Sequence, residues 1–191
     1  NVAVSEEVII SVTSVNDFPA VHAPFSVLVS NDATAAVVSG VSVTDPDIDQ
    51  ANNFITSLTV SVDAEHGLVQ MDTDAVMFKV GAAGVAASEV AIKGPLTGVN
   101  KALGSMIYIP AADYVGLDTI SVQVSDNGYS GESPKGFSPG VALTGGTTIN
   151  IMVRSSSAGS SANLTQSISS ISTVSYSNTS LDIFSLTGAS T

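Results

Sequence analysis

The sequence predicts an all-β fold, a seven-stranded Greek-key sandwich, and three observations support this prediction. Valine, isoleucine, threonine and serine dominate, and apolar and polar residues alternate with a period of two in many segments, as in half-buried strands. Turn-forming pairs such as Asn31-Asp32 and Asn127-Gly128 separate these segments. Only residues 97–104 have helical spacing, with Val99 and Leu103 four residues apart. Short strands at regular intervals with almost no helix indicate a sandwich.

The elements follow one another closely along the chain. The first expected strand, residues 7–13, reads EVIISVT, and its apolar residues form an almost continuous row. The one expected helical turn covers residues 97–104. The remaining strands are expected at residues 25–30, 36–44, 54–62, 68–71, 76–80, 88–92, 106–109, 119–125 and 147–153.

Composition excludes several classes of function. Five Lys and Arg against 17 Asp and Glu give a formal charge of −12, which argues against binding to nucleic acid or to an anionic membrane surface. No apolar run approaches the ~18 residues of a membrane span. Cysteine is absent, so disulfides and thiol chemistry are excluded. With two histidines, His22 and His66, and no motif of hydrolases, zinc proteases or P-loop enzymes, we expect no enzyme.

A weak internal repeat indicates the domain organisation. The segment EVIISVTSVND near the start parallels TTINIMVRS near residue 150. We therefore expect residues 1–17 to be the closing strand of a preceding repeat plus a linker, and residues 18–154 to be one complete sandwich. Residues 155–191 form a Ser/Thr-rich tail, either a flexible or glycosylated stalk or the first strands of a further sheet at 167–176 and 181–186.

The tail also holds two N-glycosylation triplets. They begin at Asn163 and Asn178, and their modification would imply a eukaryotic secreted protein. Two such triplets are no more than this composition produces by chance.

Three stretches together resemble cadherin-like tandem repeats of very large bacterial and algal surface proteins. Residues 15–19 (VNDFP) are similar to the linker between repeats, and residues 41–49 (VSVTDPDID) to the second strand and its acidic corner. Residues 96–128 are similar to the second half of a repeat, with the pattern residues Tyr108, Pro110, Tyr114, Gly116, Asp118 and Asp126. The resemblance implies a cadherin/immunoglobulin-like sandwich with calcium bound at the linker. Because Ser14 and Phe18 depart from the family's linker pattern, we do not expect the full three-ion set.

Acidic residues are expected to gather at one end of the sandwich. Connections between antiparallel strands alternate between two ends, which brings the turn at residues 45–49 and the turn at Asp126 to the linker. Clustered carboxylates repel one another unless a cation neutralises them, and oxygen ligands in number suit Ca²⁺. The alternative is that these acids are solvated and only cap turns. The expected metal ligands are Asn16, Asp17, Asp45, Asp47, Asp49 and Asp126.

The sequence thus predicts an extracellular or cell-surface module, stiffened by Ca²⁺, of an adhesion or fibre-forming protein. The alternative is a carbohydrate- or ligand-binding module that uses the 127–146 loop with Tyr129 and Phe137.

The expected partners are neighbouring repeats or other copies of the chain. In one hypothesis residues 7–13 complete the tail sheet of a neighbouring molecule, as in donor-strand assembly, and so build a head-to-tail filament. In the competing hypothesis a preceding repeat of a longer natural chain supplies the missing strand partner.

Overall fold

The computed structural model describes residues 7–11, 15–48, 56–128 and 140–156, and the backbone of two short strands at 175–177 and 180–182. The chain divides into two compact units, Asn1–Arg154 and Ser155–Thr191. The first unit is the sandwich. In the second, β12 (Ser175–Ser177) pairs antiparallel with β13 (Ser180–Asp182). No helix in the described ranges is both long and apolar enough to cross a membrane.

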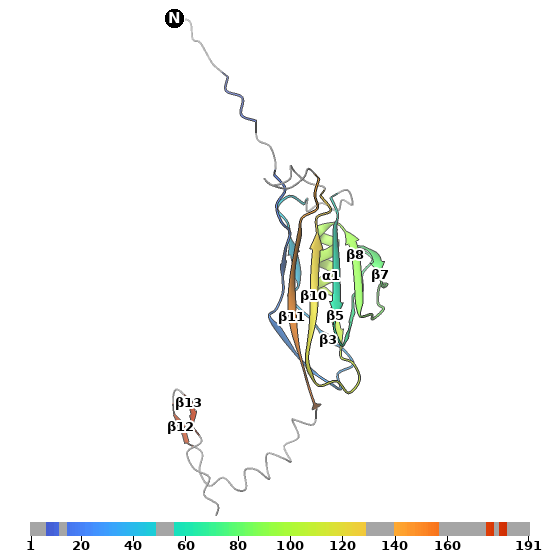
Figure 1. Cartoon of the computed structure of the whole chain (residues 1–191), viewed down its shortest axis with the longest axis vertical. Coiled ribbons are helices and arrows are strands. Elements are labelled where there is room, and N and C mark those ends of the chain that lie inside the picture. Colours follow the sequence, from blue (N-terminus) through green and yellow to red (C-terminus); the bar gives the residue numbers. More distant parts are fainter. Residues whose placement is uncertain are drawn as a thin grey trace, which may run out of the picture. The chain divides into compact units, whose positions relative to one another are not determined.

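A six-stranded sheet forms one layer of the first unit (Figure 1). Its order is β2-β11-β10-β5-β8-β7, and every pair is antiparallel except β2 and β11, which run parallel. The strands are β2 (Ser26–Ser30), β5 (Leu58–Ala64), β7 (Met77–Val80), β8 (Glu89–Gly94), β10 (Gly116–Ser125) and β11 (Thr144–Arg154).

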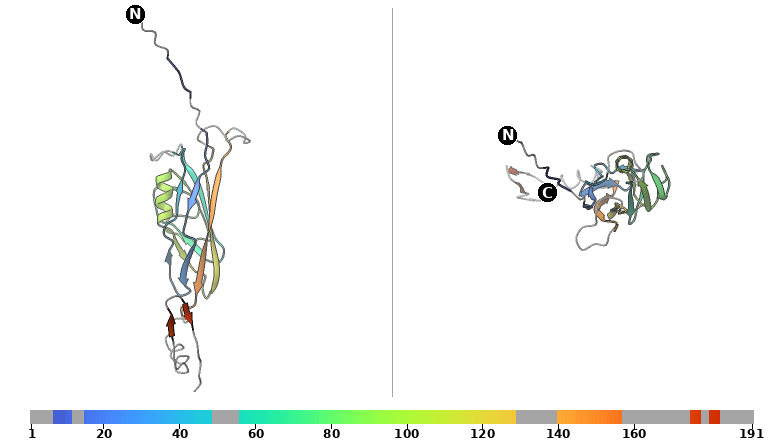
Figure 2. Two further views of the ribbon diagram at one scale, coloured as in Figure 1. Left: turned by 90° about the vertical axis from the view of Figure 1, so that its left-hand side faces the viewer. Right: turned by 90° about the horizontal axis from the view of Figure 1, so that it is seen from above.

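The second layer consists of two small sheets and the helix α1 (Leu96–Gly104) (Figure 2). One sheet pairs β1 (Ala20–His22) with β4 (Ser42–Thr44), and the other orders β3 (Ala36–Val37), β9 (Ile107–Ile109) and β6 (Leu68–Gln70) as β3-β9-β6. Asn100 joins α1 to β4, because its side-chain amide accepts from the Val43 nitrogen at 2.7 Å and donates to the Val43 oxygen at 3.0 Å.

The hydrophobic core lies between the two layers. Alternate residues of β5, including Val60 and Val62, are completely buried, as are Ile120 and Val122 of β10. Their neighbours on the same strands point outward. The strict alternation seen in the sequence therefore reflects one buried and one exposed face of this sheet.

The all-β sandwich expected from the sequence is confirmed, with strands divided more finely than the expected seven. Gly40, at φ +80°, interrupts the strand expected at 36–44 and leaves β3 and β4. The three-residue strand β1 was not predicted, because it is too short for alternation to show. Residues 7–11, expected as part of a strand, form no ladder in the described part of the chain, and Val8, Ile9 and Ile10 are at least 80% exposed.

Candidate functional site

The linker, the turn after β4 and the turn after β10 meet at one end of the sandwich, which we call the acidic pole. Asn16 is buried, and its Nδ2 donates a hydrogen bond to Asp126 Oδ2 at 2.5 Å. The backbone nitrogen of the next residue, Asp17, donates to Asp47 Oδ2 at 2.5 Å. Two carboxylates from separate turns thus hold two consecutive linker residues.

Asp126 is completely buried and organises the turn that follows β10. Its Oδ1 accepts hydrogen bonds from the backbone nitrogens of Gly128 at 2.8 Å and Leu143 at 2.7 Å. Gly128 adopts φ +71°, and a Cβ there would lie 2.4 Å from the Gly140 oxygen, so glycine is required at this turn. Both Asp126 oxygens therefore already have protein donors.

Asp45 is the acid of the pole with a buried carboxylate oxygen that has no hydrogen-bond partner. Its Oδ1 accepts from the backbone nitrogens of Asp47 at 2.9 Å and Ile48 at 3.3 Å, whereas its Oδ2 is buried and has no hydrogen-bond partner. Burial and, secondarily, the charges of Asp47 and Asp126 raise the pKa of the Asp45 carboxyl above its usual value, against the two backbone hydrogen bonds. Among the described residues no Lys or Arg forms an ion pair with the acidic pole.

Five of the six expected metal ligands lie at this pole, but no three of its acids bring ligand oxygens within 4.8 Å of one another in the described residues. They are Asn16, Asp17, Asp45, Asp47 and Asp126, while Asp49 lies outside the described residues. Tyr129 and Phe137 of the expected ligand-binding loop, and the glycosylation candidates Asn163 and Asn178, also lie outside them.

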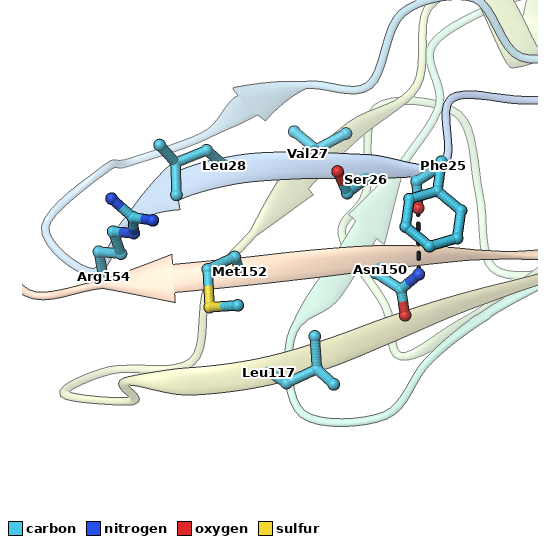
Figure 3. A pocket seen from close by; sticks show the side chains of 8 residues that line it. All are labelled: Phe25, Ser26, Val27, Leu28, Leu117, Asn150, Met152 and Arg154. Carbon is cyan, nitrogen blue, oxygen red and sulfur yellow. Dashed lines mark hydrogen bonds between the residues drawn. The ribbon is translucent and has the colours of Figure 1, made fainter. Parts of the chain in front are cut away.

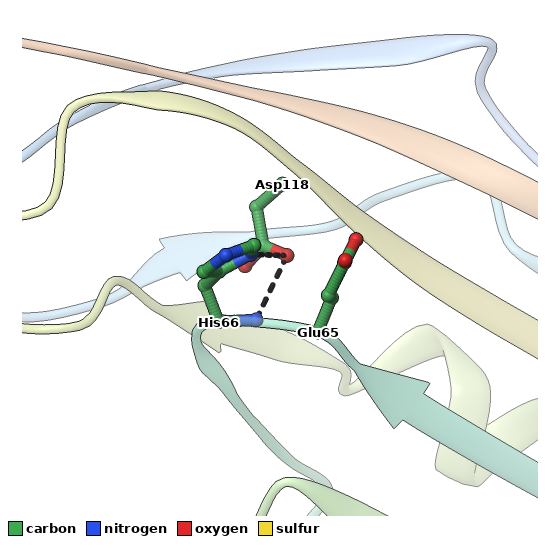
Figure 4. A group of neighbouring side chains, drawn as sticks. All are labelled: Glu65, His66 and Asp118. Atoms are coloured by element: carbon green, nitrogen blue, oxygen red, sulfur yellow. Dashed lines mark hydrogen bonds and ion pairs between the residues drawn. The ribbon is translucent and has the colours of Figure 1, made fainter.

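A second polar cluster lies near the start of β10 (Figure 4). The meeting of its residues was not predicted from the sequence. Glu65, His66 and Asp118 form the one triplet of acidic or histidine ligand atoms within 4.8 Å of one another in the described residues. His66 stacks on Tyr114 with ring centroids 4.6 Å apart. Its Nδ1 lies 3.4 Å from Asp118 Oδ1.

Asp118 is completely buried, and its hydrogen bonds identify the cluster as structural. Oδ1 accepts from the backbone nitrogens of His66 and Thr119, and Oδ2 accepts from the Gly67 nitrogen at 2.8 Å and the Tyr108 hydroxyl at 2.5 Å. Burial alone raises the pKa of Asp118, but these four hydrogen bonds outweigh it and hold the pKa below its usual value. Since each oxygen already has two donors, the carboxylate holds the turn together and has no capacity left for a metal ion.

Comparisons with known proteins add little to this geometry. No family model matches the chain, and no curated protein is similar in sequence. Among solved structures the chain is similar to AggA, the major subunit of aggregative adherence fimbriae type I from Escherichia coli. The identity is 15%, the TM-score is 0.32, and the match covers 72% of this chain and 97% of AggA. These comparisons do not identify a cadherin-like repeat, so that assignment stays a proposal.

Proposed function

We propose that the chain is a structural module of an extracellular surface or fibre-forming protein, and that Ca²⁺ bound at the acidic pole stiffens its linker. The observation that carries the proposal is the pairing of consecutive linker residues with carboxylates of two turns, Asn16 with Asp126 and Asp17 with Asp47. A cation held by the same carboxylates would restrain the linker further and remove hinge freedom between successive modules.

The residues of the pole offer the donor chemistry of a calcium site, and an ion would have to draw them together, since no three acids of the pole bring ligand oxygens within 4.8 Å of one another in the described residues. Asp45 Oδ2 is a buried oxygen without a hydrogen-bond partner, which is costly unless something supplies a positive charge. The side chains of Asp17, Asp45 and Asp47, with Asn16 and Asp126 beside them, offer the hard oxygen ligands that Ca²⁺ takes in number. Calcium accepts flexible coordination, whereas magnesium demands a near-ideal octahedron and retains its waters.

The proposed setting follows from the same chemistry. Extracellular calcium modules bind with Kd values of about 10⁻⁴–10⁻³ M, so a site of this kind is filled outside the cell. We propose a mechanical role without catalysis, as a cadherin-like repeat flanked by further repeats or by other copies of the chain. In a eukaryotic host, Asn163 and Asn178 would carry glycans.

Thermal unfolding in calcium and in chelator tests the proposal. At a free Ca²⁺ concentration 100-fold above Kd, binding to the folded state alone adds about 2.7 kcal/mol, which raises Tm by roughly 5–10 °C for a domain of this size. Asp45→Asn keeps the acceptor used by Asp47 and Ile48 but removes the charge, so it should lose most of this increment. Asp72→Asn, at an exposed acid on the connection after β6, is the control and should keep it.

The same variants test the electrostatic argument without calcium. Because the pKa of Asp45 is raised in the folded protein, its charge destabilises the fold at neutral pH, and acidification through the folded pKa relieves this effect. In chelator at neutral pH Asp45→Asn should therefore be at least as stable as the unchanged protein. Identical melting curves of the unchanged protein in calcium and chelator would refute the calcium site.

A further inference from the structure

An apolar groove crosses the outer face of β2, β11 and β10 (Figure 3). It has a volume of about 500 Å³. The registers place Leu28, Met152 and Leu117 side by side across the three strands, and these side chains are 60%, 42% and 53% exposed. Three adjacent, half-exposed apolar side chains on an outer face indicate a surface that binds a partner.

Along β10 and β11 the apolar character of the outer face is confined to the groove. Farther along the same face β10 presents Ser121 and Gln123, and β11 presents Thr148, as expected for a solvated face. The groove ends at Phe25, whose backbone is held in place. The Phe25 oxygen accepts hydrogen bonds from both the backbone nitrogen and Nδ2 of Asn150, each at 3.1 Å, while the residue is 84% exposed.

The groove borders a free strand edge. β2 is at the end of the six-stranded sheet and pairs only with β11 in the described residues. Its sequence, SVLVS, contains none of the proline or charged residues that usually protect such an edge. The edge therefore offers backbone hydrogen-bonding groups to an added strand, and the groove beside it offers apolar contacts.

The same chain carries a segment that matches this surface. Val8, Ile9 and Ile10 are 80–86% exposed. In an extended strand Val8 and Ile10 face one side and Ile9 the other, so such a strand presents apolar side chains to the groove in either register. Glu7 precedes these residues, and Arg154, the single arginine of the chain, lines the far end of the groove.

We propose that residues 7–11 of one copy add as a strand to the free edge of β2 in a second copy, with the apolar side chains of one face beside Phe25 and Leu28 at the β2 side of the groove. Pairing of Glu7 with Arg154 selects the antiparallel direction, because Arg154 lies opposite Ser30 at the end of β2 and Phe25 lies at its start. Each copy then has one strand to give and one groove to fill, so the contact is head-to-tail and builds an open chain of molecules. This surface differs from the tail strands β12 and β13 that the sequence suggested as the acceptor.

Complementation between two variants tests the contact. Deleting residues 1–13 removes the donor strand, and Leu28→Asp places a charge on the outer face of β2, directly beside the added strand. Each variant should sediment as a monomer, and an equal mixture should form dimers and nothing larger. Thr148→Asp, at an outward-facing position of the neighbouring strand β11 away from the groove, is the control and should assemble like the unchanged protein.

A charge exchange tests the direction of the added strand. Glu7→Arg and Arg154→Glu should each weaken association by about tenfold, and the double variant should restore it. The inference is overturned if the unchanged chain stays monomeric at high concentration, if the mixed variants do not pair, or if deletion of residues 157–191 abolishes assembly. All measurements are made both in calcium and in chelator, because assembly does not require the acidic pole and the two proposals can fail separately.

Discussion

Replacing Tyr108 by phenylalanine isolates the contribution of one buried, charge-assisted hydrogen bond. The Tyr108 hydroxyl donates to Asp118 Oδ2 at 2.5 Å, and both residues are completely buried. The substitution keeps the ring in the core and leaves Asp118 with three backbone donors. Hydrogen bonds to charged groups contribute about 1.5–3 kcal/mol, so we expect the free energy of unfolding to fall by that amount. For a domain of this size Tm should fall by roughly 3–12 °C.

Tyr114→Phe is the matched control, because it removes the same hydroxyl from a neutral and more exposed bond. The Tyr114 hydroxyl donates to the Leu117 backbone oxygen at 2.6 Å, and neutral hydrogen bonds contribute only about 0.5–1.5 kcal/mol. Equilibrium unfolding in urea measures both variants, with unchanged m values showing that the unfolded states are comparable. Equal losses in the two variants would refute the argument that the buried carboxylate strengthens the Tyr108 bond.

Acidification provides a second, independent check. The folded pKa of Asp118 lies below its ordinary value of 3.8, so its ionised form stabilises the fold fully above that value. This contribution is lost as the pH falls from 3.8 through the folded pKa. The deficit of Tyr108→Phe should therefore shrink over that range, since a protonated Asp118 accepts hydrogen bonds less strongly. A deficit that is the same at neutral pH and at the acid end of the range would contradict the assignment.

Two further substitutions, one of them with a control variant, test how the layers are held together. Gly67→Ala should lower the free energy of unfolding by about 1–3 kcal/mol, because a Cβ there would lie 2.3 Å from Tyr108 Cε2. Gly104→Ala is the control in the same urea titration. It lies at the open end of α1 and should be neutral or slightly stabilising. Asn100→Ala removes both bonds to the buried Val43 backbone and should cost about 1–3 kcal/mol, with loss of hydrogen-exchange protection in β4 as its local signature.

Much of the sheet could be predicted from the sequence because one face of its long strands is buried. The strand expected at residues 119–125 is the C-terminal part of β10, and the helical spacing at 97–104 corresponds to α1 within one residue. The meeting of the linker with Asp45 and Asp126 could also be predicted, since it depends only on the alternating direction of antiparallel strands.

Features that depend on register between distant strands could not be predicted. His66 and Asp118 are 52 residues apart, and they meet because β5 pairs with β10 so that Ala64 lies opposite Ile120. The groove likewise depends on the parallel pairing of β2 with β11, two strands far apart in the sequence for which no pairing was predicted. A period-two pattern gives the face to which a residue points but not the partner strand or its register.

The contrast between two buried carboxylates argues for the acidic pole as the place where a cation would stabilise this fold. Asp118 near the start of β10 has two donors on each oxygen, and its pKa is lowered despite burial. Asp45 at the acidic pole has donors on one oxygen only, and its pKa is raised. The first carboxylate gains nothing from an added cation because its charge is already compensated. The second would gain both a missing partner and relief of repulsion, so calcium should act on the linker end of the sandwich alone.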